Sequence, residues 1–279
     1  MGYKVAAAKA THSVPRPQPH PPHQALREAC TTLAREAARE IMRIYAGDLG
    51  ERTKADQSPV TDADHAAEAI IVAGLRELTP GTPVVAEEEM AAGRLPGLDG
   101  GPFWLVDPLD GTKEFIKRNG EFTVNIALIE DGRPALGIVL APATDTLWRG
   151  TVGLGADKSQ HGGAFTAIHT RTPPPEGLTA FASRSTAIYS DLDIWFRSSG
   201  LTVVERKQAG SSLKFCLIAE GLADIYPRFG PTNEWDTAAG QGVLEAAGGE
   251  VVTTDGRSLT YGKPGLGNPH FIARSRAAR

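Results

Sequence analysis

The hydrophobic pattern of the chain changes at Pro173-Pro174-Pro175, and this change limits the folds that it can adopt. Before these prolines, two helical patterns precede a group of strands, whereas after them short strands alternate with helices. Grouped strands favour an antiparallel sheet, and alternation favours a parallel or mixed sheet. We therefore expect an α/β protein of the α+β type with two halves, residues 25–172 and 173–279, behind a disordered Pro- and His-rich extension, residues 1–24.

The first half is expected to place two helices on its sheet. Apolar residues at helical spacing predict one helix over residues 25–45 and another from the N-cap Thr61 to residue 78. Glu130-Asp131-Gly132 is typical of a hairpin turn between two apolar runs. The expected strands cover residues 84–86, 103–106, 122–129, 136–141 and 146–151.

The second half is expected to alternate between the two kinds of element. The predicted strands cover residues 178–182, 203–204, 223–226 and 250–253. The predicted helices cover residues 190–199, 211–220 and 237–247. The sequence contains no internal repeat that would suggest a different architecture.

Composition and charge exclude several classes of protein. The 279 residues carry a net charge of −4, which argues against a nucleic-acid polymer as the main partner. Cys30 and Cys216 both lie in apolar patterns, so we expect no disulfide framework and a cytoplasmic location. No apolar run is long enough to span a membrane. Homodimer formation and peripheral association with the inner membrane are left open.

Asp107-Pro108-Leu109-Asp110-Gly111-Thr112 is the segment most informative about function. It follows the predicted strand 103–106, so its carboxylates are expected in a turn at a strand end, where α/β enzymes place their chemistry. Pro108 stiffens this turn, and Gly111 lets a ligand approach the backbone. Carboxylates beside exposed backbone N–H groups suit Mg²⁺ together with a phosphate. The alternative is a surface Asp turn that caps a helix.

Other acidic residues stand out, but each has a structural alternative. Asp64 lies early in the second helix, where it could serve only the helix dipole. Glu87-Glu88-Glu89 follows a predicted strand and could be a solvent-exposed charge run. Asp236, next to Trp235, could be the N-cap of the helix that follows. None of these residues decides the function alone.

In combination and in this order, the segments resemble the inositol monophosphatase superfamily of metal-dependent, lithium-sensitive phosphatases. The shared pattern is formed here by Asp64, Glu87-Glu88, Asp107 to Thr112, Trp235-Asp236 and Gly248-Gly249. An ordered match of several parts is more specific than any one of them. The resemblance covers residues 25–274 and implies a layered αβαβα sandwich, with an antiparallel sheet in the N-terminal half and a mixed or parallel sheet in the C-terminal half.

Three further segments are similar to the CysQ branch of this superfamily, the bacterial 3′(2′),5′-bisphosphate nucleotidases. These segments are Lys113 to Asn125, Gly210 to Cys216 and Tyr226 to Asn233. The CysQ branch removes the 3′-phosphate of adenosine 3′,5′-bisphosphate, a by-product of sulfate assimilation, and releases AMP. The resemblance therefore implies a phosphoric monoester hydrolase whose substrate is a nucleotide bisphosphate.

The resemblance also implies a role for each site residue. The ligands of about two or three Mg²⁺ ions would be Glu87, Asp107, the carbonyl group of Leu109, Asp110 and Asp236. The hydroxyl group of Thr112, held by Asp64, would orient the attacking water together with Glu87. The backbone N–H groups of Gly111 and Thr112 would bind phosphate oxygens. If the acidic run lay in a strand, only one of Glu87 and Glu88 would face the metals.

The nucleotide would be bound by Ser211, Lys214 and Arg228, since Lys and Arg suit a second phosphate. The full substrate site would also include Glu87, Leu109, Asp110, Gly111, Thr112 and Asp236. One departure is Thr186, which follows Ser183-Arg184-Ser185 where the family often carries His. Any nucleotide contact from that His is lost or replaced by a hydroxyl group.

Two alternative functions are weighed against this prediction. An inositol monophosphatase or a fructose-1,6-bisphosphatase would share the metal site, but Ser211, Lys214 and Arg228 argue against it. A non-catalytic sensor of a phosphate ligand is expected to lack a metal carboxylate or Thr112, and none of these is missing. The preference between related bisphosphates stays open at this point.

Overall fold

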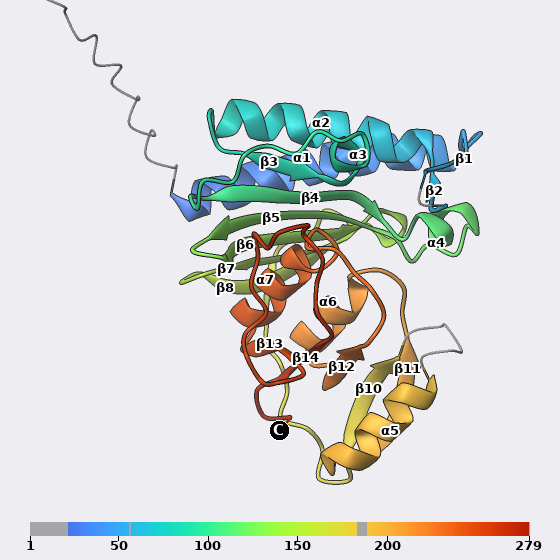
Figure 1. The fold of residues 1–279 in the computed structure, drawn as a ribbon, viewed down its shortest axis with the longest axis vertical. Coiled ribbons are helices and arrows are strands. Elements are labelled where there is room, and N and C mark those ends of the chain that lie inside the picture. The colour runs from blue at the N-terminus through green and yellow to red at the C-terminus, as the bar shows by residue number, and fades with distance from the viewer. Residues whose placement is uncertain (1–21, 56, 183–188, 279) are drawn as a thin grey trace, which may run out of the picture.

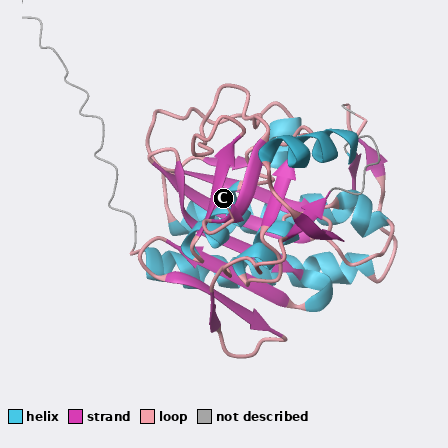
Figure 2. Ribbon diagram, turned by 90° about the horizontal axis from the view of Figure 1, so that it is seen from below, coloured by secondary structure: helices cyan, strands magenta, loops and turns pink. Residues whose placement is uncertain are grey.

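The computed structural model describes residues 22–55, 57–182 and 189–278. Its elements are stacked in the order helices, sheet, helices, sheet, helix, which confirms the expected αβαβα sandwich (Figure 1). The outer pair of helices, α1 (His23–Tyr45) and α2 (Asp62–Leu78), lies side by side on one face of the larger sheet. Figure 2 shows the same elements from below, with helices and strands in different colours.

The larger sheet has seven strands in chain order, and only its first pair is parallel. The strands are β3 (Val84–Ala86), β4 (Phe103–Asp110), β5 (Thr123–Glu130), β6 (Arg133–Ala141), β7 (Thr146–Thr151), β8 (Gly155–Gln160) and β9 (Thr166–Ile168). A short η1 turn (Pro142–Thr144) joins β6 to β7. The predicted hairpin is confirmed, because Asp131 and Gly132 both have positive φ angles, 50° and 71°, between β5 and β6.

The smaller sheet has five strands and is mixed, as predicted. In spatial order they are β11 (Val203–Gln208), β10 (Leu178–Ala182), β12 (Ile225–Arg228), β14 (Phe271–Ser275) and β13 (Gly249–Thr253). The first three are parallel, and β14 is antiparallel to both of its neighbours. Helix α5 (Tyr189–Ser199) covers the outer face of this sheet (Figure 1).

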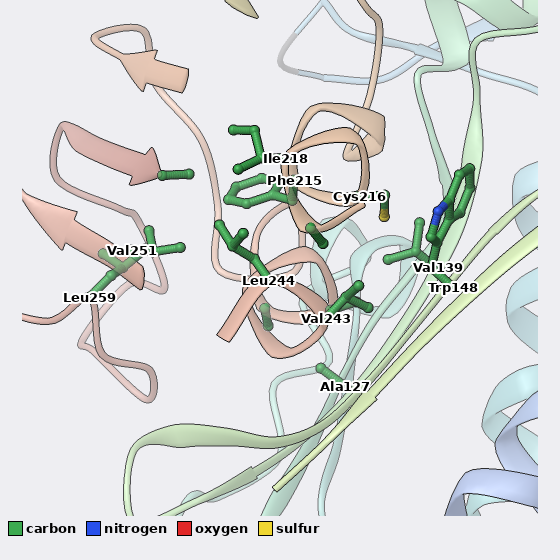
Figure 3. Packing of buried hydrophobic residues seen from close by; sticks show 14 of the residues in the cluster. Ala127, Val139, Trp148, Phe215, Cys216, Ile218, Val243, Leu244, Val251 and Leu259 are labelled. Carbon is green, nitrogen blue, oxygen red and sulfur yellow. The ribbon is translucent and has the colours of Figure 1, made fainter. Parts of the chain in front are cut away.

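Helices α6 (Leu213–Ala219) and α7 (Ala238–Ala246) lie between the two sheets and share one core with both. Figure 3 shows Val243 and Leu244 of α7 between Val139 of the larger sheet and Val251 of the smaller one. The two halves of the chain are therefore joined by one apolar core. Their division after residue 172 stays a prediction.

Helix α7 approaches the larger sheet closely because β6 and β7 each present a glycine to it. A Cβ atom on Gly150 would lie 2.4 Å from the carbonyl oxygen of Gly242, and one on Gly137 would lie 2.3 Å from that of Ala239. Both distances are too short for a real side chain. We call this contact the glycine seam, and it places the start of α7 against the larger sheet.

The short elements were not predicted from the sequence. They are β1 (Arg52–Thr53), β2 (Pro59–Val60), α3 (Glu87–Ala91) and α4 (Thr112–Ile116). Strands β8, β9 and β14 were also missed. Residues 23 and 24 were wrongly assigned to the extension, since α1 begins at His23, where the Pro22 carbonyl group accepts the first helical N–H groups. Residues 1–21 lie outside the described part of the chain.

Among the described residues, no helix is long and apolar enough to cross a membrane. Cys30 and Cys216 are free and buried, which agrees with the expected lack of a disulfide framework.

Candidate active site

The Asp-Pro motif lies at the end of β4, but the strand does not stop at residue 106 as expected. It continues to Asp110, and its pairing with β5 shifts between Asp107 and Asp110. Asp107 is 1% exposed, and its Oδ1 accepts the N–H group of Leu109 at 3.1 Å. Gly111 has a φ of 94°, and a Cβ atom there would lie 2.9 Å from the Glu121 carbonyl oxygen. This sharp exit, which only glycine tolerates, turns the chain into α4.

Asp64 links the start of α2 to the hydroxyl group of Thr112. Thr61 is the N-cap, as predicted, and its N–H and hydroxyl groups both donate to Asp64 Oδ2 at 2.7 Å. The other oxygen, Oδ1, accepts the Thr112 hydroxyl group at 3.1 Å. Asp64 therefore completes a capping box and also accepts a hydrogen bond from Thr112, while its catalytic role stays a prediction.

Glu87 and Glu88 face the same cation, the ammonium group of Lys54. Lys54 Nζ lies 2.7 Å from Glu87 Oε1 and 2.6 Å from Glu88 Oε1. The strand assumed for these acids is wrong, because Glu87 begins helix α3, whereas the expectation that only one of the two faces the metals stays a prediction. Glu89 points elsewhere and pairs with Arg76 at 2.8 Å. Lys54 itself was missed, since a single lysine carries no sequence signal of such a contact.

Asp236 stands just before α7 but is not its N-cap. The N-cap is Thr237, and Asp236 Oδ2 instead accepts the N–H group of Asn233 at 2.8 Å. Burial raises the pKa of Asp236 to about 8, and the charges of Asp110 and Glu87 add to this shift. The neighbouring Trp235 is buried in the shared core.

The acidic residues raise one another's pKa values, which shows that the fold gathers them in one region. Burial raises the pKa of Asp107 well above its usual range, and the charges of Glu87, Asp110, Asp236 and Asp64 act in the same direction. Burial also raises the pKa of Glu87, although the Lys54 ammonium group opposes this effect. So many buried carboxylates are costly to ionise unless a cation accompanies them.

The donor set suits Mg²⁺, which prefers oxygen ligands. However, among the described residues no three Asp, Glu, His or Cys side chains are already arranged around a single metal position. Glu87 is bonded to Lys54, and Asp110 Oδ2 accepts the hydroxyl group of Ser211 at 2.7 Å. The carboxylates fit a metal by chemistry and position, and these side chains would turn to coordinate it.

Two adjoining cavities open at the site. The first, about 650 Å³, is lined by Glu87, Gly111 and Thr112 among others, and we call it the acidic lobe. The second, about 470 Å³, is lined by Lys117, Lys214 and Arg228 among others, and we call it the basic lobe. The residues that line both cavities are Asp110, Lys113, Glu114, Thr232 and Asp236.

Comparison with known proteins agrees with this arrangement. Residues 23–277 match the model of the inositol monophosphatase family. The chain belongs to the inositol monophosphatase family. It is 46% identical over 235 residues to the 3′(2′),5′-bisphosphate nucleotidase CysQ of Escherichia coli K12, covering 82% of this chain and 91% of that protein.

Solved structures of the inositol monophosphatase family have the same fold. The crystal structure of CysQ from Bacteroides thetaiotaomicron is 38% identical, with a TM-score of 0.76 over 91% of this chain and 98% of that one. An inositol monophosphatase from Anabaena is 25% identical, with a TM-score of 0.71 over 91% and 92% of the two chains. The sequence is thus more similar to these CysQ proteins than to that inositol monophosphatase.

The three residues predicted to bind the nucleotide all line the basic lobe, and they are Ser211, Lys214 and Arg228. Each of them forms different hydrogen bonds. Lys214 is buried, and its ammonium group donates to the carbonyl groups of Ala209 at 3.0 Å and Ser211 at 2.6 Å. Burial lowers its pKa to about 8. Arg228 Nη2 donates to the Pro231 carbonyl group at 3.1 Å, while its buried Nε has no hydrogen-bond partner among the described residues.

The prediction for Thr186 lies outside the described residues. A polar network around Ser211 was missed. Thr123 contacts the hydroxyl groups of Ser211 and Ser212, and Ser212 donates to Asn125 Oδ1 at 2.7 Å. Its members come from β5 and from the segment before α6, which are far apart in the sequence, so no local pattern could have revealed it.

Proposed function

We propose that the chain is a Mg²⁺-dependent nucleotidase that hydrolyses the 3′-phosphate of adenosine 3′,5′-bisphosphate to give AMP and phosphate. The observation that carries this proposal is the junction of an acidic and a basic lobe at Asp110 and Asp236. A substrate with two phosphates can place the reacting one among the metal ligands and the other among cations. The names of the CysQ relatives support the same activity.

The residues that would hold Mg²⁺ are Glu87, Asp107, the Leu109 carbonyl group, Asp110 and Asp236. The ions would lower the pKa of a bound water and offset the charge that develops on the phosphate and on the leaving oxygen. Lys54 would release Glu87 when an ion binds, because both cations use the same carboxylate. The remaining steps depend on the protein's own side chains.

Thr112 and Asp64 would orient the attacking water. The Thr112 hydroxyl group donates to Asp64 Oδ1, so its oxygen can accept a hydrogen bond from water. Glu87 would accept a proton of the same water as the water oxygen bonds to phosphorus and the bond from phosphorus to the 3′ oxygen breaks. The leaving 3′ oxygen would take up a proton from solvent to give the 3′-hydroxyl group of AMP. The N–H groups of Gly111 and Thr112 would bind phosphate oxygens, since they follow a turn fixed by the positive φ of Gly111.

The alternatives fit the site less well. Inositol monophosphate has a single phosphate and would leave the basic lobe without an anion. Fructose 1,6-bisphosphate has two phosphates but lacks the base and ribose of a nucleotide. A sensor without activity would not need Thr112 and Asp64 to be held together beside the metal ligands. The free, buried thiol groups of Cys30 and Cys216 support the proposed cytoplasmic location.

A phosphate-release panel tests the proposal. The purified protein, with and without Mg²⁺, is given adenosine 3′,5′-bisphosphate, its phosphosulfate analogue, inositol monophosphate and fructose 1,6-bisphosphate. We expect the highest kcat/KM for one of the two nucleotides, no turnover without Mg²⁺, and inhibition by lithium at millimolar concentrations. Turnover of inositol monophosphate without turnover of either nucleotide would refute the proposal.

A further inference from the structure

Helix α4 and the C-cap residue that follows it contribute two lysines that the mechanism above does not use. Lys113 and Lys117 are four residues apart and therefore lie on the same face of this short helix. Lys113 lines both lobes, and Lys117 lines the basic lobe only. Both side chains are exposed, and neither forms an ion pair with another described residue. Their ammonium groups are thus available to an anion in the cavity.

The other cations of the basic lobe are more restricted. Two of the three N–H donors of Lys214 are bonded to the carbonyl groups of Ala209 and Ser211. Arg228 donates one nitrogen to the carbonyl group of Pro231. A phosphate dianion has several acceptor sites, so these two side chains leave part of its hydrogen-bonding capacity unfilled. The lysines of α4 stand at the same cavity and can supply the missing donors.

The position of α4 connects the two phosphate groups of a substrate. The helix begins at Thr112, which lines the acidic lobe. It ends at Ile116, directly before Lys117, which lines the basic lobe. An anion bound by Lys113 and Lys117 would therefore be held by the same rigid turn that holds the reacting phosphate. Such a connection fixes the separation between the two phosphates.

We propose that Lys113 and Lys117, together with Arg228, anchor the non-reacting phosphate and so determine the preference for nucleotide bisphosphates over nucleotide 3′-monophosphates. This inference rests on the proposed nucleotidase function and extends it to residues with no role in the water attack. The inference predicts that removal of these lysines lowers activity on the bisphosphate more than on the monophosphate, because the monophosphate has no second phosphate for them to bind.

The test compares Lys113→Gln, Lys117→Gln and the double variant with the unmodified protein in the presence of Mg²⁺. The substrates are adenosine 3′,5′-bisphosphate and adenosine 3′-monophosphate. For the double variant, kcat/KM on the bisphosphate should fall about 10- to 100-fold, mainly through KM, as expected for lost charge-assisted hydrogen bonds. On the monophosphate it should change less than about threefold. Lys117→Arg should restore most of the preference.

Arg39→Gln is the matched control, because it also removes one positive charge but lies on the exposed face of α1. This variant should leave kcat/KM unchanged on both substrates. An equal loss on both substrates, or no loss on either, would overturn the inference. If the unmodified protein hydrolyses no nucleotide at all, the proposed function fails instead, so the two failures can be told apart.

Discussion

The acidic and basic lobes are built in different ways. The proposed metal ligands beside the acidic lobe come from the end of a strand and the starts of helices, and backbone N–H groups hold two of them: Asp107 accepts that of Leu109, and Asp236 that of Asn233. The basic lobe instead contains long side chains, of which Lys113 and Lys117 are exposed. The difference teaches that backbone groups position part of the acid cluster, whereas the recognition of the substrate depends on long side chains that line the cavity.

The largest effect is expected from a change among the proposed metal ligands. Asp107→Asn should lower kcat by at least about 1000-fold, because a proposed central metal ligand loses its charge while the shape is kept. The fold should survive, since the change removes repulsion among buried carboxylates. Phosphate release and circular dichroism measure the two effects. Glu89→Gln is the control, because Glu89 pairs with Arg76, and this variant should retain activity within about twofold.

The glycine seam, which joins α7 to the larger sheet, is the next target. Gly150→Ala should reduce the free energy of unfolding by about 2 to 3 kcal/mol, because its Cβ atom would overlap the backbone of α7. Denaturant unfolding measures this change. Gly101→Ala introduces the same atom where nothing lies within 4 Å and should have little effect. Equal stability of the two variants would show that α7 can move away from the sheet freely.

A smaller effect is expected where the lobes meet. Ser211→Ala removes the hydrogen bond that orients Asp110, a proposed metal ligand, and should weaken Mg²⁺ binding about 10-fold. Both residues have a Cβ atom, so the positive φ of 54° is equally unfavourable before and after the change. Calorimetric titration with Mg²⁺ gives the affinity. Ser198→Ala, on α5, serves as the control.

The smallest effect is expected in the dependence of the protein's stability on pH. Burial raises the pKa of Asp236 to about 8 and those of Glu68 and Glu88 to about 7. Between about pH 4 and pH 8 the native state therefore binds more protons than the unfolded state, so the metal-free protein should lose stability as pH rises. Thermal melts at pH 5 and pH 8 test this.

Mg²⁺ binds the ionised carboxylates, so it should raise the melting temperature more at pH 8 than at pH 5. The variant Glu88→Gln should show a weaker dependence on pH, because one of the raised carboxyl groups is gone. A metal-free protein whose stability rises over this range would contradict the assignment of proton binding to these buried carboxyl groups.

Long apolar patterns allowed most of the fold to be predicted. Helices α1 and α2 and the hairpin at Asp131-Gly132 follow from local spacing and turn residues. Strand β8 was missed because its sequence, Gly155–Gln160, is largely polar and only partly buried. Helices α3 and α4 have five residues each, too few to show a helical period. Their formation depends on tertiary contacts.

The acidic part of the candidate site was visible in the sequence, because its residues belong to short motifs. Its basic partners were less visible. Lys54 reaches Glu87 and Glu88 only when the β1–β2 hairpin folds against α3, and no local pattern reports that contact. The spacing of Lys113 and Lys117 directly after the motif was a signal that could have been used.

The glycine seam has a consequence for substrate size. Asp236 lies two residues before α7, and Gly137 and Gly150 set how near that helix comes to the sheet that carries Asp107 and Asp110. Because these two glycines have no side chains, they allow the two walls of the catalytic cleft to lie close together, although neither glycine lines the cleft. A family member with larger residues at these positions would have a wider cleft, and the molecules it accepts would change without any change in the residues that touch them.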